Sequence, residues 1–103
     1  MKLLIQTALI AATVGLSAPA LANQALAQKS GCLACHAIDK KVVGPAYQDV
    51  AKKYAGNTKP EELAKRIKAG GSGHWGPVPM PPQAALSEAD AKTLATWILG
   101  GAK

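Results

Sequence analysis

The residues of this 103-residue chain that are best suited to chemistry lie together in Cys32-Leu33-Ala34-Cys35-His36. Two thiols separated by two residues lie near enough, on a helical turn, to reach the two vinyl groups along one edge of a porphyrin. The histidine that follows would then lie under the iron. The C-x-x-C-H pattern therefore predicts a covalently attached haem c, with Cys32 and Cys35 as thioethers and His36 as an axial ligand.

Three other interpretations of these residues stay open. A reactive thiol pair of the thioredoxin kind would follow a strand in a βαβ unit, and no segment after residue 22 alternates apolar and polar residues convincingly. A zinc site would need four ligands, and His36 is too close to Cys35 for the usual finger spacing, with His74 as the only other candidate. A structural disulfide between Cys32 and Cys35 would close too small a loop to stabilise the rest of the chain.

Met80 is the best candidate for the second axial ligand, which a low-spin haem that only carries electrons needs on its opposite face. It is the only methionine outside the first 22 residues, and Pro79 and Pro81 stiffen the backbone around it. Methionine is more often core filler, but this one lies in a segment that predicts neither helix nor strand. His74 and the lysines are the other candidates for this ligand.

The first 22 residues predict a secretory leader. Lys2 precedes an apolar run, and small residues end the segment at Ala22, so we expect cleavage after Ala22 and a domain of residues 23–103. The apolar run is shorter than the ~20 residues that span a bilayer, which argues against an anchor. We therefore expect a soluble periplasmic protein without stable membrane insertion.

The predicted mature chain is basic, because residues 23–103 contain 11 Lys and Arg against 6 Asp and Glu. This excess predicts an anionic partner, either an acidic protein surface or anionic lipid. Export and the absence of a recognition motif argue against nucleic acid. A monomer is the expected oligomeric state. The excess charge is carried mostly by lysines in separate segments, among them Lys29, Lys40, Lys41, Lys52, Lys53, Lys65 and Lys68.

The composition of residues 23–103 predicts an all-α domain with a prosthetic group at its centre. Of the 81 residues 35 are apolar, but 15 of these are alanine and none is phenylalanine. An apolar core of this size supplies roughly a few kcal/mol, so buried surface must come from elsewhere. Glycine and proline fill eight of the thirteen positions 70–82, which excludes regular structure there. Helical periodicity, capping boxes and glycine stops predict four short helices at about 23–31, 47–54, 58–70 and 87–100.

The sequence resembles the small bacterial class I c-type cytochromes of the c-551/c-552 type. The resemblance covers essentially all of residues 23–103, and its most specific parts are the stretches 31–39, 43–47 and 75–82. It implies the class I cytochrome c fold, in which short helices surround one covalent haem c. It also implies that the carbonyl of Pro45 accepts the second imidazole N–H of His36, and that Arg66 and Trp75 reach a haem propionate.

The function that the resemblance implies is one-electron transfer and not the conversion of a substrate. Such proteins pass electrons between respiratory partners, for example a cytochrome bc1-type donor and a nitrite reductase or terminal oxidase. A haem enzyme or gas sensor is the alternative, and it would need Met80 to be absent from the iron or easily displaced. The chain departs from some relatives at Ala27, where a large aromatic is common, and at Tyr54, where phenylalanine is common; both changes concern packing.

Overall fold

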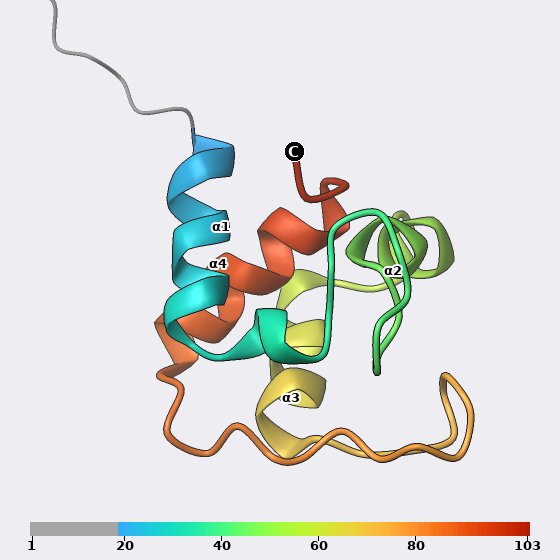
Figure 1. Cartoon of the computed structure of the whole chain (residues 1–103). Helices are drawn as coiled ribbons and strands as arrows, with labels where there is room; N and C mark the ends of the chain where they lie inside the picture. The colour runs from blue at the N-terminus through green and yellow to red at the C-terminus, as the bar shows by residue number, and fades with distance from the viewer. Residues whose placement is uncertain (1–18) are drawn as a thin grey trace, which may run out of the picture.

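The structure is a computed structural model that describes residues 19–103, and it is all-helical (Figure 1). No strand occurs in this part of the chain, where only two isolated bridges, His36 with Lys41 and Gly71 with Met80, pair extended residues. The all-α prediction is confirmed. The helices are α1 (Pro19–Lys29), the 3-10 helix η1 (Cys32–Ala34), α2 (Tyr47–Tyr54), α3 (Pro60–Ala69) and α4 (Glu88–Leu99).

Helix α4 organises the fold, because it packs against each of the other three α-helices. It begins where the sequence predicts, at the N-cap Ser87, whose hydroxyl accepts a hydrogen bond of 3.1 Å from the backbone N–H of Asp90. Its predicted apolar stripe is buried. The positions of α1, α2 and α3 are therefore all set by their packing on α4.

Two helix starts differ from the sequence-based prediction. Helix α1 begins at Pro19 and not near Asn23, since proline suits a first helical turn; the predicted cleavage point after Ala22 therefore lies inside α1. Helix α3 has Lys59, and not Thr58, as its N-cap, and no side-chain hydrogen bond forms there because the lysine ammonium cannot accept one. The Thr58 hydroxyl donates to Asn57. Most of the predicted leader, residues 1–18, lies outside the described residues.

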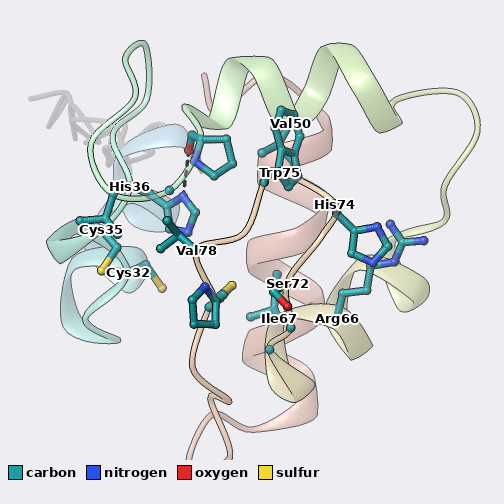
Figure 2. A pocket seen from close by; sticks show the side chains of 18 of the residues that line it. Cys32, Cys35, His36, Val50, Arg66, Ile67, Ser72, His74, Trp75 and Val78 are labelled. Atoms are coloured by element: carbon teal, nitrogen blue, oxygen red, sulfur yellow. Dashed lines mark hydrogen bonds between the residues drawn. The ribbon is translucent and has the colours of Figure 1, made fainter.

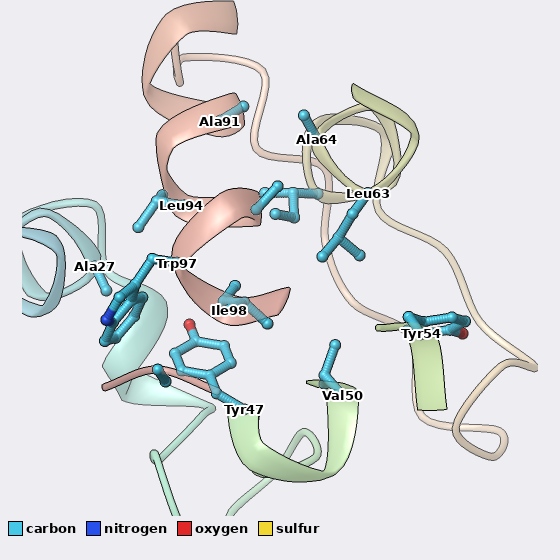
Figure 3. Close-up of a cluster of buried hydrophobic side chains, with 13 residues drawn as sticks. Ala27, Tyr47, Val50, Tyr54, Leu63, Ala64, Ala91, Leu94, Trp97 and Ile98 are labelled. Carbon is cyan, nitrogen blue, oxygen red and sulfur yellow. The ribbon is translucent and has the colours of Figure 1, made fainter. Parts of the chain in front are cut away.

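The apolar core is thin, in agreement with the composition. Leu94 is the only large side chain among the described residues with less than 2% of its surface exposed. Figure 3 shows the cluster around it, in which Tyr47 meets Trp97 edge to face with ring centroids 5.5 Å apart. Small residues such as Ala27 and Ala91 fill much of the remaining core. The helices thus leave space at the centre that their own side chains do not fill.

The described helices are too short or too polar to serve as membrane spans.

Candidate functional site

The central space is a cavity of about 340 Å³ between the C-x-x-C-H turn, α2, α3 and the 70–82 loop (Figure 2). Its lining includes His74, Lys41 and the apolar face of α4. The cavity also brings together every site residue predicted from the sequence, from four separate stretches of the chain: Cys32, Cys35, His36, Pro45, Arg66, Trp75 and Met80.

The two cysteines are presented on a short turn of their own. Helix α1 ends at Lys29, Gly31 takes a left-handed conformation with φ of 79°, and η1 then carries Cys32. Both thiols are free and partly buried. Burial raises the pKa of the Cys32 thiol, the opposite of the lowered pKa that a reactive redox thiol needs.

No group of three or more His, Cys, Asp or Glu side chains in the described part of the chain is arranged to hold a metal ion.

The His36 ring is held from several sides. Its Nδ1 lies 2.8 Å from the carbonyl oxygen of Pro45, and because a carbonyl only accepts, Nδ1 carries the proton. Nε2 is then left with its lone pair free for a metal. The ring also stacks on Tyr47, with centroids 5.1 Å apart and planes 18° from parallel. Burial, together with the neighbouring Cys32 thiol, raises the pKa of Tyr47, which keeps its ring neutral.

Gly44 completes the support of His36, a role that was not predicted from the sequence. A Cβ built on Gly44 would lie 2.8 Å from Nδ1 of His36 and closer still to Cε1, which is nearer than side chains approach one another. The residue is therefore small because the imidazole occupies the space beside it. The only signal in the sequence is its position directly before Pro45.

We expect Gly44→Ala to disturb the His36 ring. The added methyl overlaps the imidazole, so the ring must move away from the Pro45 carbonyl or the backbone must shift, at a cost of about 1–3 kcal/mol. Urea unfolding of the haem-loaded protein measures the loss, and the visible spectrum reports the iron ligation. Gly100→Ala is the matched control, since a Cβ there meets its nearest atom at an ordinary 3.4 Å. Equal stability of the two variants would contradict the packing argument.

Met80 is fastened to the end of α3 by backbone contacts. The N–H of Gly71 donates to the carbonyl of Met80 at 3.0 Å, and the N–H of Met80 donates back at 2.8 Å. Gly70, with φ of 65°, lies so close that a Cβ would meet the backbone of Pro81 and Pro82 at 2.7 Å. A glycine is thus required at the end of α3 for the methionine segment to approach.

Arg66, Trp75 and Tyr54 form another part of the cavity lining. The Arg66 guanidinium carbon lies 5.0 Å above the centre of the Tyr54 ring, and Trp75 meets the same ring edge to face. The Tyr54 hydroxyl is buried and has no hydrogen-bond partner among the described residues. A buried hydroxyl of this kind is unfavourable alone, so an oxygen atom of a bound group would stabilise it.

These residues fit a haem attached through two thioethers. The cavity is open and mostly apolar in its lining, two thiols lie at its edge, and one imidazole nitrogen is free for iron. A bound haem would supply a one-electron redox centre. An all-helical shell around such a cavity, with the C-x-x-C-H turn in its wall, defines a c-type haem protein.

The chain belongs to the cytochrome c family, whose sequence pattern matches residues 18–102. It is 56% identical over 92 residues to cytochrome c-552 of Hydrogenobacter thermophilus, covering 88% of this chain and 93% of that protein. It is 58% identical over 77 residues to cytochrome c-551 of Pseudomonas aeruginosa, covering 74% and 73%. The crystal structure of Nitrosomonas europaea cytochrome c552 superposes with a TM-score of 0.73 at 52% identity, covering 76% of this chain and 98% of that one.

The predicted fold and cofactor are therefore confirmed. The chain has the class I cytochrome c fold and binds one covalent haem c. It acts as a small electron carrier and not as an enzyme.

Proposed function

We propose that the haem of this electron carrier is held by residues that all line the central cavity. Cys32 and Cys35 form the thioethers, and His36 and Met80 are the axial ligands. Pro45 orients His36 through its carbonyl, while Arg66 and Trp75 contact a haem propionate. The observation that carries this proposal is the fixed tautomer of His36 in a cavity that Met80 also lines.

The visible spectrum of the ferric protein tests this ligand set. A thioether bound to ferric iron gives a charge-transfer band at the red end of the spectrum, which a second histidine, a lysine or water does not give. We expect this band in the wild-type protein at neutral pH. Its absence would contradict the assignment of Met80, and with it the inference that no iron position is open to oxygen or peroxide.

The chain's own residues set how easily an electron enters and leaves. A soft thioether favours ferrous iron and raises the reduction potential. The apolar lining keeps water from the iron, which also favours the form with less net charge. The backbone contacts described above hold His36 and Met80 in place, so these two side chains need to move little when the electron is transferred.

We propose further that residues 1–22 are a leader cleaved after Ala22 and that the mature protein works in the periplasm as a monomer. Support comes from the apolar, small-residue pattern of that segment. Its partners would be respiratory redox proteins, such as a cytochrome bc1-type donor and a nitrite reductase or terminal oxidase.

The rim of the cavity is suited to docking of such partners. Val43 and Val78 line the cavity and are 51% and 59% exposed, and Val42, which precedes Val43 in the chain, is 49% exposed. Lys41 lies next to this apolar group and also lines the cavity, with Lys40 beside it in the chain. An apolar contact with positive charge next to it fits an acidic protein surface.

Electron exchange with an acidic redox protein should slow as salt rises. Above ~0.1 M salt the Debye length is below ~10 Å, so attraction between the surfaces is screened. Stopped-flow measurement of the bimolecular rate tests this, and we expect Lys41→Gln to lower the rate at low salt. Lys92→Gln is the charge-matched control, because Lys92 pairs with Glu61 at 3.1 Å and does not line the cavity. A rate independent of salt would assign docking to apolar contact alone.

A further inference from the structure

Lys53 joins α2 to the glycine-rich loop at the cavity. Its Nζ donates a hydrogen bond of 2.7 Å to the backbone carbonyl of His74. The same Nζ lies 4.6 Å from the centre of the Trp75 ring, within the range of a cation–π contact. No other hydrogen bond joins α2 to the 70–82 loop in the part of the chain that the structure describes. Figure 2 shows His74 and Trp75 on the loop that borders the pocket.

Lys53 is also one of two cations that contact the ring pair Trp75 and Tyr54; the other is Arg66. Trp75 meets Tyr54 edge to face with centroids 6.1 Å apart, and Arg66 lies on the Tyr54 ring. Lys53 Nζ is 5.4 Å from the centre of the Tyr54 ring as well. Trp75, Tyr54 and Arg66 line the cavity, whereas Lys53 does not. Lys53 therefore contacts residues of the cavity wall without lining the cavity itself.

The loop needs such a contact because little else restrains it there. Helices α2 and α3 each pack on α4, but their backbones do not pack directly on one another. The 70–82 loop contains Gly73 and Gly76, with φ of 93° and 103°, so its backbone has wide conformational freedom. Trp75 on this loop is 41% exposed, so the contacts of its ring with Tyr54 and Lys53 carry much of the burden of holding it in one place.

We propose that Lys53 is a positioning residue that fastens the Trp75 segment to α2 and so keeps Trp75 on the wall of the haem pocket. The inference rests on the proposed contact between Trp75 and a haem propionate. It gives Lys53 a role distinct from docking, because its Nζ is engaged by the His74 carbonyl.

Three variants of the haem-loaded protein test this role. Lys53→Met removes the donor and the charge but keeps the length of the side chain. Lys52→Met removes the same charge from the next residue, whose ammonium lies 4.0 Å from the Asp49 carboxylate on the same helix. Lys53→Arg keeps a cation that can still donate to the His74 carbonyl and lie over the ring.

The first measurement is amide hydrogen exchange of Gly73 in the ferrous protein. The Gly73 N–H donates to the Gly76 carbonyl at 2.9 Å across the turn that carries Trp75, so it reports opening of that turn. We expect exchange about tenfold faster in Lys53→Met, as for the loss of one charge-assisted hydrogen bond, with Lys52→Met near wild type and Lys53→Arg largely restored. Equal exchange in Lys53→Met and Lys52→Met would overturn the proposal.

The second measurement is the reduction potential, which a purely structural contact in a remote loop would not move. We expect it to fall further in Lys53→Met than in Lys52→Met, because displaced Trp75 no longer donates to the propionate. Equal potentials in these two variants would overturn the link from Lys53 to the haem.

The variant Trp75→Phe separates this proposal from the proposed propionate contact. A wild-type potential in Trp75→Phe would show that the propionate contact itself is wrong. The exchange of Gly73 would then still decide the role of Lys53.

Discussion

Replacing Met80 with alanine should convert the carrier into a protein with an open iron site. Backbone hydrogen bonds of 2.8 and 3.0 Å between Gly71 and Met80 hold the methionine segment in place, so the loop should stay folded while the alanine leaves the iron without a thioether. We expect loss of the thioether charge-transfer band, a high-spin ferric spectrum, and binding of small ligands such as cyanide or azide. Val78→Ala, in the same loop and 59% exposed, is the control that should keep the band.

The companion variant Met80→His should lower the reduction potential. A nitrogen donor stabilises ferric iron better than a soft thioether does. Axial ligands tune haem potentials over ~0.8 V in total, so the shift should be a sizeable part of that range. Protein-film voltammetry measures it directly. An unchanged spectrum and potential in Met80→Ala would place another residue on the iron, with His74 and Lys41 next, since both line the cavity.

Removing both thiols, by Cys32→Ala with Cys35→Ala, should abolish covalent haem and largely unfold the chain. The helices surround a cavity of about 340 Å³, and Leu94 is the only large side chain below 2% exposure in the described part. An apolar core this small does not offset the conformational entropy of folding by itself. Far-ultraviolet circular dichroism of the purified double variant measures the remaining helix.

The single variants Cys32→Ala and Cys35→Ala serve as controls for the double variant, because each keeps one possible thioether. We expect them to hold haem in lower yield and to unfold at lower urea concentration than the wild type. A double variant that is haem-free and fully helical would contradict the inference that the cofactor completes the core.

Local sequence signals predicted the helices well where one residue decides the boundary. Ser87 caps α4 through its own hydroxyl, and Gly70 ends α3 with a positive φ, so both boundaries follow from residue chemistry. Thr58 shows the limit of such signals. Its spacing to Glu61 suits a capping box, but the N-cap of α3 lies one residue later, at Lys59, and the Thr58 hydroxyl donates to Asn57. This shift of one residue depends on backbone geometry that the sequence does not contain.

The cavity residues were predictable because their chemistry is unusual, whereas the residues that support them were not. A C-x-x-C-H turn and a methionine between two prolines each suit only a few chemical roles. Gly44, Tyr47 and Lys53 are common residue types whose roles depend on tertiary neighbours. Gly44 and Tyr47 pack against the His36 ring, and Lys53 contacts the Trp75 segment. Tertiary contacts of this kind leave no periodic pattern in a single sequence.

Mass spectrometry of the exported, purified protein tests most directly whether haem is covalently attached to this chain. We expect one species that starts at Asn23, carries the added mass of one haem after denaturation, and has no thiol that reacts with an alkylating reagent. Denaturation matters, because it releases a haem that is bound only through its iron. A mass equal to that of the polypeptide alone, with two alkylated cysteines, would contradict covalent attachment and the role of Cys32 and Cys35.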